Sequence, residues 1–258
     1  MLKTRVIPCL LLDGSSLVKT ERFRDPKYIG DPANTLRIFN ELEVDEIFIL
    51  DIRAARGEEP RYDILQECVD ECFMPLAYGG GIRDLAQAKR LIGMGMEKVV
   101  VNSAASRNPS LVRELADHFG SQAVVGSIDV KKKLFGGYEV MIDGGRTGTG
   151  RDPVEYALEL RRQGAGEILV TSIDREGTWT GFDVPLVKKI SESLDVPVIA
   201  HGGGGSIADI REAVRSGGAS AVALGSMLVF QKKGLGVLVN FPERAELEKA
   251  LDPGEDAV

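Results

Sequence analysis

The sequence is poor in the residue types that build disulfide frameworks and metal centres. Its 258 residues include three cysteines, two histidines and one tryptophan. An odd, low cysteine count is typical of a protein from the reducing cytoplasm, where we expect this chain to reside. Cys68 and Cys72 lie one helical turn apart with no histidine or further cysteine nearby. We interpret both as ordinary helix thiols and expect neither a metal site nor a cofactor.

Long apolar runs and excess positive charge are also missing. The apolar run near the N-terminus spans about seven residues, which is too short to cross a bilayer, and no small-residue cleavage site follows it. The formal net charge of -7 argues against nucleic acid or an anionic membrane surface as the partner. A phosphorylated small molecule stays compatible, because glycine-rich loops bind phosphate even within acidic proteins.

Short apolar, β-branched segments alternate with amphipathic ones along the whole chain. The expected strands are Arg5–Leu11, Glu46–Asp51, Met74–Tyr78, Lys98–Asn102, Ala123–Asp129, Glu167–Ile173, Val196–His201 and Ser220–Gly225. The expected helices are Pro32–Glu43, Tyr62–Cys72, Leu85–Gly95, Pro109–Phe119, Pro153–Gln163, Val184–Ser193, Ile207–Ser216 and Glu243–Leu251. This alternation predicts an α/β fold, a single (β/α)8 TIM barrel over residues 1–258, with an open doubly wound sheet as the alternative.

Several motifs recur at a constant offset of 123 residues. The matched pairs are Asp51 with Asp174, Gly79–Gly81 with Gly202–Gly204, and Asn102-Ser103 with Gly225-Ser226. The repeat predicts two half-barrels, about residues 1–122 and 123–258, related by a twofold axis. It also predicts two equivalent ligand half-sites on opposite sides of one barrel mouth.

Both glycine runs follow a strand and open onto a helix, in YGGGIRD (Tyr78–Asp84) and HGGGGS (His201–Ser206). Glycine lets the backbone approach a ligand closely, and the N–H groups at the following helix start suit an anion. The serine-containing segments at the ends of strands four and eight add hydroxyl groups. Tight strand–helix turns would need glycine too, but the symmetric pairing favours a ligand with a phosphate at each end.

Three aspartates end otherwise apolar strands: Asp51, Asp129 and Asp174. Barrel active sites are built at the carboxyl ends of the strands, so these carboxylates are candidate site residues. The alternative is that each one caps a helix or anchors a loop.

The whole chain resembles HisF, the cyclase subunit of imidazole glycerol phosphate synthase. The resemblance is carried by RVIPCL, LVK, GDP, DEIFILDI, GGGIRD, GSQAVV, SID and GAGEILVTSIDREGT. HisF closes the imidazole ring of imidazole glycerol phosphate and releases an aminoimidazole carboxamide nucleotide. It uses ammonia that travels through the barrel from a separate glutaminase. The resemblance therefore implies a lyase-type subunit of a glutamine amidotransferase, with an ammonia channel and a place in histidine biosynthesis.

The resemblance implies a catalytic acid–base pair on strands one and five. Asp129 matches the strand-five aspartate, but Leu11 stands where the strand-one aspartate belongs. A leucine cannot transfer a proton. Asp13 lies two residues farther on the same strand face and is the candidate substitute, displaced outward by about 6–7 Å.

Other matching positions are implied to contact the ligand or its phosphates. They are Lys19, Asp51, Gly81, Asn102, Ser103, Thr171, Glu176, Gly177, His201, Gly202, Gly203, Gly225 and Ser226. Glu176 replaces an aspartate of the family. His201 replaces a small hydroxyl residue, and we weigh a new acid–base or phosphate contact against a filler of a reshaped pocket.

The opposite barrel face carries the charges of the HisF ammonia gate. Arg5, Glu46, Lys98 and Glu167, here called the charged ring, stand at the starts of alternating strands. The resemblance implies a HisH-like glutaminase partner at this N-terminal face. Solvation of strand starts near water is the alternative.

The missing strand-one aspartate favours a specialised HisF paralogue over an ordinary cyclase. The N-terminal pattern CLLL…LVKT…YIGDP resembles paralogues that occur with a glutaminase-like protein and a sugar amidotransferase in surface-polysaccharide biosynthesis. We therefore expect ammonia relay for sugar amidation. The alternatives are a working cyclase of histidine biosynthesis and a phosphate-binding assembly subunit without chemistry.

Overall fold

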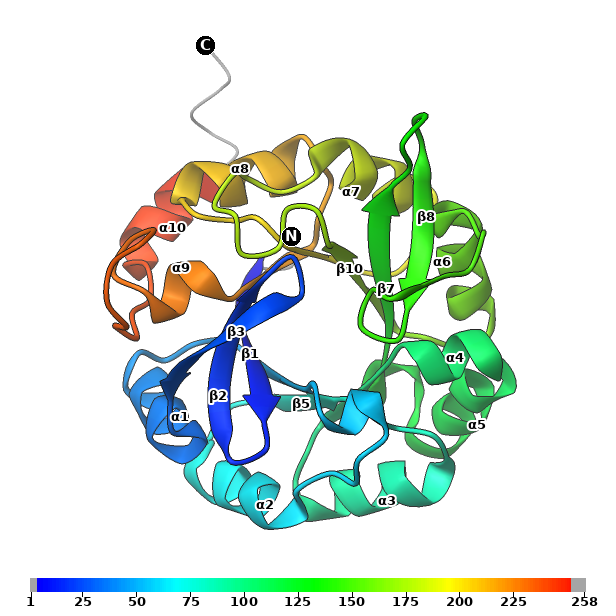
Figure 1. Cartoon of the computed structure of the whole chain (residues 1–258), viewed down its shortest axis with the longest axis horizontal. Helices are drawn as coiled ribbons and strands as arrows, with labels where there is room; N and C mark the ends of the chain where they lie inside the picture. Colours follow the sequence, from blue (N-terminus) through cyan, green and yellow to red (C-terminus); the bar gives the residue numbers. More distant parts are fainter. Residues whose placement is uncertain (1–3, 252–258) are drawn as a thin grey trace.

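The computed structural model describes residues 4–251, and its centre is a closed barrel of eight parallel strands (Figure 1). The barrel strands are β1 (Arg5–Asp13), β4 (Ile47–Asp51), β5 (Leu76–Gly79), β6 (Lys98–Val101), β7 (Val124–Lys132), β10 (Glu167–Ser172), β11 (Val198–His201) and β12 (Ala221–Leu224). Each strand pairs in parallel with the next, and β12 pairs with β1 to close the ring. The predicted TIM barrel is thereby confirmed.

Helices surround this barrel. They are α1 (Pro32–Glu41), α2 (Tyr62–Glu71), α3 (Leu85–Met94), α4 (Ser103–Arg107), α5 (Ser110–Phe119), α6 (Pro153–Arg162), α7 (Val184–Ser191), α8 (Ile207–Arg215), α9 (Ser226–Val229) and α10 (Arg244–Leu251), with short 3-10 turns at Ala54–Arg56 and Ser121–Ala123. Asp31 and Asp152 cap α1 and α6 through their side chains, and each is followed by a proline in the first turn. Among residues 4–251, no helix has the length and apolar character needed to cross a membrane.

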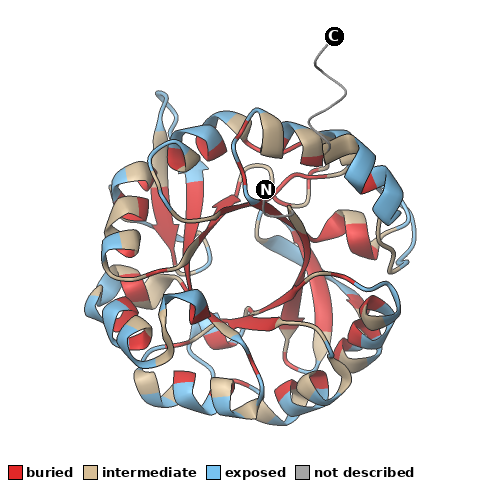
Figure 2. Ribbon diagram, turned by 180° about the vertical axis from the view of Figure 1, so that it is seen from behind, coloured by how far each residue is buried: buried red, intermediate tan, exposed pale blue. Residues whose placement is uncertain are grey.

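Side chains alternate along the strands between two apolar layers. One layer fills the space between the barrel and the helices, and Figure 2 shows it as buried positions on the strands and on the inner helix faces. The other lies inside the barrel and comprises Ile7, Cys9, Phe48, Ala77, Val100, Val125, Leu169, Ile199, Ala221 and Ala223, with Leu50 packed against it. The barrel axis is therefore apolar between its two polar ends.

Strand starts differ from the sequence expectation where a proline intervenes. The third and seventh barrel strands were expected from Met74 and Val196, but β5 begins at Leu76 and β11 at Val198. Pro75 and Pro197 precede these starts and have no N–H to donate to a ladder. Their carbonyl groups still accept hydrogen bonds from Ile47 and Ile168.

Two antiparallel extensions at the mouth were not expected from the sequence. After β1 the chain forms a hairpin, β2 (Ser16–Glu21) and β3 (Arg24–Gly30), in a segment where no strand was expected. After β7 it forms β8 (Tyr138–Ile142), which pairs with β7 and with the short β9 (Thr147–Gly148). Both extensions rise from carboxyl ends of barrel strands, so they border the predicted site (Figure 1).

Candidate functional site

Asp129 lies on the inner face of β7 near the mouth, with 9% of its surface exposed. Burial raises the pKa of this carboxyl to about 7, and hydrogen bonds from the side chains of Asn102 and Thr171 act in the opposite direction. Thr171 faces Asp129 because the two residues are register partners on β10 and β7. A carboxyl with a pKa near neutrality can both give and take a proton, which suits a general acid–base.

Leu11 lies at the corresponding depth on β1, also buried. Its register partners are Leu50 of β4 and Val18 of β2. It therefore presents only C–H groups where the resemblance described above implies a carboxylate. Asp13, the candidate substitute, ends β1 at the rim and forms an ion pair with Arg53 from the segment after β4. Arg53 contacts one of the two carboxylate oxygens of Asp13. The proton-transfer role of Asp13 stays a prediction.

His201 ends β11 and is buried at the mouth. Its ring nitrogen Nδ1 lies 3.1 Å from the hydroxyl oxygen of Thr171, its register partner on β10. Burial lowers the pKa of His201 to about 3, and the positive charge of Lys19 lowers it further. The imidazole is therefore neutral at physiological pH, and its unprotonated ring nitrogen can accept a hydrogen bond.

Lys19 reaches into the mouth from β2. Its ammonium group forms a buried ion pair with Glu176, in the segment after β10, and its side chain lies over Gly225. Glu176 also accepts hydrogen bonds from the hydroxyl of Thr20 (3.1 Å) and the backbone N–H of Phe23 (3.0 Å). One buried carboxylate thus holds the β2–β3 hairpin across the mouth, a closure that was not predicted from the sequence.

Gly177 allows this close approach of the hairpin. Its φ is +75°, and a Cβ added there would lie 2.4 Å from the carbonyl oxygen of Thr20. A side chain at Gly177 must therefore displace the hairpin, in addition to straining its own backbone.

We expect Gly177→Ala to open the hairpin. Gly150 has a similar φ of +73° with no atom within 4 Å of an added Cβ, so Gly150→Ala is the matched control. Both variants should lose about 1 kcal/mol of stability from backbone strain. Only Gly177→Ala should accelerate amide hydrogen exchange in residues 16–30, by about tenfold or more. Equal exchange in the two variants would mean that the contact does not hold the hairpin.

The first half-site is formed by Gly79–Gly81 with Asn102 and Ser103. Gly80 and Gly81 have φ values of +125° and +68°, and a Cβ on Gly80 would lie 2.3 Å from the carbonyl oxygen of Asp51. Ser103 begins α4, and its hydroxyl accepts the backbone N–H of Asp143 at 2.9 Å. The glycines thus pack directly on the end of β4, and the hydroxyl already has a partner.

The second half-site is formed by Gly202–Gly204 with Gly225 and Ser226. A Cβ on Gly203 would lie 2.2 Å from the carbonyl oxygen of Gly181. Ser226 begins α9, as Ser103 begins α4. A small pocket here is lined by both glycine segments together with Lys19 and His201. Backbone N–H groups at a helix start, a hydroxyl and a lysine form a setting suited to an anion.

Two strand-end aspartates are engaged by the backbone. Asp51 accepts hydrogen bonds from the N–H groups of Arg53 and Ala54, each at 2.9 Å, and from the hydroxyl of Tyr78 at 3.2 Å. Asp174 accepts the N–H of Lys132 at 2.8 Å. In this state both carboxylates anchor loops at the mouth, and direct ligand contact by Asp51 stays a prediction.

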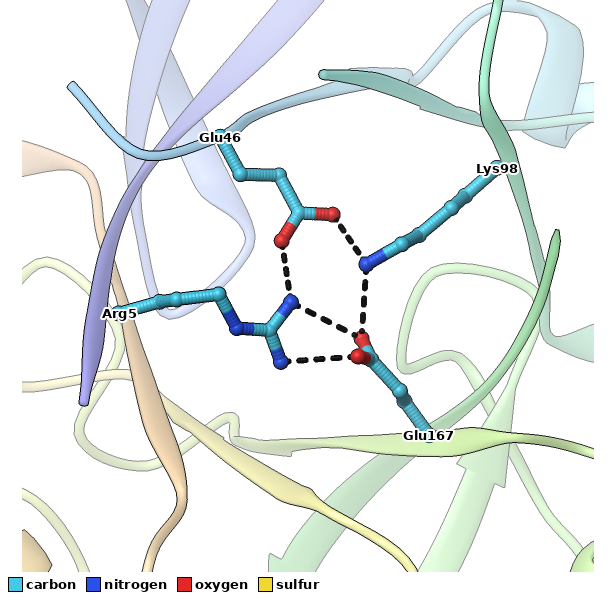
Figure 3. A network of polar contacts seen from close by, with 4 residues as sticks. All are labelled: Arg5, Glu46, Lys98 and Glu167. Atoms are coloured by element: carbon cyan, nitrogen blue, oxygen red, sulfur yellow. Dashed lines mark hydrogen bonds and ion pairs between the residues drawn. The ribbon is translucent and has the colours of Figure 1, made fainter. Parts of the chain in front are cut away.

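The charged ring closes the opposite end of the barrel (Figure 3). Arg5 contacts Glu46 at 2.5 Å and Glu167 at 2.8 Å, and Lys98 contacts the same carboxylates at 2.6 and 3.2 Å. Burial opposes the charge of Arg5, but Glu167 and Glu46 together raise its pKa above the ordinary value. The sequence placed these four residues at strand starts, and the structure brings them into one alternating ring.

Two residues at the mouth were missed by the sequence reasoning. Trp179 lines the pocket of the second half-site, and its φ is +62°. Cys9 is buried close enough to Lys19 and Asp129 to interact with both charges, and burial raises the pKa of its thiol to about 12. Its inward position follows from strand alternation, because Cys9 shares a face with Leu11. No comparable periodicity marks Trp179, which lies outside the regular elements.

Comparisons with known proteins agree with this architecture. Residues 5–233 match the family model described as histidine biosynthesis protein. The chain is 49% identical to the protein named hisF2 from Pseudomonas aeruginosa, over 96% of this chain and 99% of that one. It is 42% identical to imidazole glycerol phosphate synthase subunit HisF from Alkaliphilus metalliredigens, over 90% and 92% of the two chains. Identity to the protein named hisF3 from Vibrio vulnificus is 41%, over 98% of each chain.

Proposed function

Because the chain belongs to the HisF family of imidazole glycerol phosphate synthase subunits, we propose that it receives ammonia from a glutaminase and uses it on a phosphorylated ligand. The glutaminase, a HisH-like subunit, docks at the N-terminal face around the charged ring. Ammonia passes along the apolar barrel axis to the mouth. The ligand is held there by the two half-sites.

The charged ring is the observation that carries this proposal. Its four charges pair only with one another in the interactions described above, at the end of the barrel farthest from Asp129. Buried ion pairs add little stability compared with apolar packing, so their arrangement invites a role beyond folding. The apolar layer between the ring and the mouth excludes bulk water, which keeps transferred ammonia unprotonated.

We further propose that the chain is a specialised paralogue that supports sugar amidation in surface-polysaccharide biosynthesis. Leu11 supports this finer role, because an ordinary cyclase needs a proton-transfer group at that position. Two relatives whose names refer to imidazole glycerol phosphate synthase subunits carry the numbered names hisF2 and hisF3, and such numbering fits organisms with more than one HisF-like protein. On this hypothesis a sugar amidotransferase receives the ammonia or its product.

Two other functions remain alternatives. A working cyclase of histidine biosynthesis is favoured by Asp129, because burial gives its carboxyl a pKa near neutrality. A phosphate-binding assembly subunit without chemistry is favoured by Leu11 alone, and the charged ring argues against it. Neighbouring genes separate the first two, since a glutaminase and an amidotransferase without histidine genes fit only the paralogue.

The test of ammonia delivery is Lys98→Ala in the complex with the co-encoded glutaminase. Lys98 contacts both ring carboxylates, and Arg5 still pairs with them after the substitution. We expect a stability loss of about 1–2 kcal/mol, because Glu46 keeps one of its two cations. The ring should nevertheless open, so the glutamate released per molecule of aminated product should rise at least severalfold.

Lys89→Ala, at an exposed position on α3, is the control and should leave the ratio unchanged. Two results together would contradict the proposal: an unchanged ratio of glutamate to aminated product in Lys98→Ala, and no binding to the co-encoded glutaminase. The four charges would then only solvate the starts of their strands. The ratio can be measured with the cyclase substrate as the ammonia acceptor. In that case Lys98→Ala and Lys89→Ala are each combined with Leu11→Asp, the variant discussed below.

A further inference from the structure

Three side chains at the mouth lie side by side on neighbouring strands. Thr171 of β10 is the register partner of Asp129 on β7 and of His201 on β11. Its hydroxyl lies 3.1 Å from Nδ1 of His201, and it is also near enough to the Asp129 carboxyl to lower the pKa of that group. Side chains of register partners in a parallel sheet point to the same face, so the three groups form a continuous array inside the barrel.

The position of this array matters because Leu11 leaves the mouth without its usual second acid–base group. Around the barrel, β11 lies two strands from β7 and two strands from β1. His201 therefore stands a quarter-turn from Asp129, whereas Leu11 stands opposite to it. His201 also lines the pocket of the second half-site, so its free ring edge is next to the proposed ligand.

We propose that His201 is the second proton-transfer group of this mouth, oriented by Thr171 and coupled through it to Asp129. The proposal rests on the function proposed above, since it assigns a residue to the ammonia chemistry of that site. Thr171 donates its hydroxyl proton to the Asp129 carboxylate and accepts the Nδ1–H of His201. The lone pair of His201 Nε2 is then directed to the mouth.

The chemistry suits an acceptor that is phosphorylated and carries a carbonyl carbon. When ammonia adds to that carbon, a C–N bond forms and the π pair of the carbonyl moves to its oxygen. The nitrogen then carries protons that the oxygen needs. In the first transfer, Nε2 moves a proton from the nitrogen to the oxygen and gives a carbinolamine. In the second, it moves another proton from the nitrogen to the hydroxyl group, the C–O bond breaks to release water, and the electron pair of the nitrogen forms the C=N bond. Carbonyl and ammonia thus become imine and water, and His201 ends as it began.

The charged groups around the imidazole of His201 determine its pKa, and therefore the conditions under which it can transfer a proton. The ionisable groups near it are Lys19 on β2, Asp129 on β7 and Glu176 after β10, and Cys9 on β1 interacts with Lys19 and Asp129. Burial and Lys19 lower the pKa of His201 to about 3 in the free protein. A phosphate anion in the second half-site compensates the charge of Lys19 and favours the imidazolium, so ligand binding raises this pKa.

The experiment is nitrogen NMR of the full chain labelled at histidine. The chain has two histidines, and His118, exposed on α5, is an internal control. Unmodified protein should show His201 as the Nδ1–H tautomer. Thr171→Val should shift it towards the Nε2–H tautomer, and Thr171→Ser should restore the original spectrum. Inorganic phosphate should raise the pKa of His201 by at least one pH unit without affecting His118.

Two results would overturn the inference. One is a tautomer that does not respond to Thr171→Val in a variant whose His118 signal is native. The other is a His201 signal unaffected by phosphate while the amide signals of Gly203 and Gly225 shift. If those amides do not shift, the phosphate site of the proposed function has failed. The tautomer result still decides whether Thr171 orients the imidazole.

Discussion

Leu11→Asp is expected to raise ammonia-dependent cyclase turnover by about 10²- to 10⁴-fold, the usual contribution of a general acid–base. The substitution restores a carboxylate on β1 opposite Asp129. Leu11 is buried, but its inner-face position borders the mouth and lies outside both apolar clusters. A carboxylate there should cost about 1–3 kcal/mol of stability without unfolding the barrel. Turnover is measured with the cyclase substrate and free ammonia.

Leu11→Asn is the matched control, since it is similar in size and polarity to Asp but cannot exchange a proton in this range. It should show no gain. If Leu11→Asp folds and binds the cyclase substrate yet gains nothing, the missing carboxylate is not what separates this mouth from a cyclase. The remaining differences, His201 and Glu176, would then carry the distinction.

Asp129→Asn is expected to change how stability depends on pH. Burial raises the pKa of Asp129 from 3.8 to about 7, so the folded protein keeps this proton at pH values where the unfolded chain has lost it. The free energy of unfolding therefore falls as pH rises from about 4 to about 7. Asn carries no such proton. The variant should gain on the order of 3 kcal/mol relative to the unmodified protein between pH 4 and pH 8.

Urea unfolding at several pH values measures this difference. His201 acts in the opposite direction, because its lowered pKa makes stability fall as pH drops below about 6.5. It is present in both proteins, so the comparison largely removes its contribution. Asp117→Asn, exposed on α5, is the control and should follow the unmodified protein. A difference between Asp129→Asn and unmodified protein that is constant with pH would show that Asp129 ionises like an exposed aspartate.

The sequence predicted the barrel well because its strands carry strong local signals. Buried runs such as Ile47–Asp51, and caps such as Asp31-Pro32, depend on neighbours within a few residues. The positions of the charged ring followed from strand starts and from the family resemblance. The four side chains meet in one ring only because the barrel closes, and sequence patterns within a few residues do not predict that closure.

The mouth was less predictable because its contacts join distant segments. Lys19 and Glu176 are 157 residues apart, and each alone resembles an ordinary surface charge in the sequence. Asp13 was considered as a substitute acid–base, but its neighbour Arg53 comes from another strand end. The hairpin β2–β3 was missed because β2 is buried along most of its length and β3 is mostly exposed. Such strands lack the apolar alternation that marks a half-buried sheet.

The most direct measurement is ammonia-dependent turnover of the cyclase substrate by the unmodified protein, beside a HisF of histidine biosynthesis. We propose that this barrel keeps ammonia delivery and ligand binding but has lost half of the cyclase acid–base pair at Leu11. Turnover should then be at least about 10²-fold below that of the HisF under the same conditions. Equal turnover by the two proteins would contradict the account and identify the chain as a working cyclase.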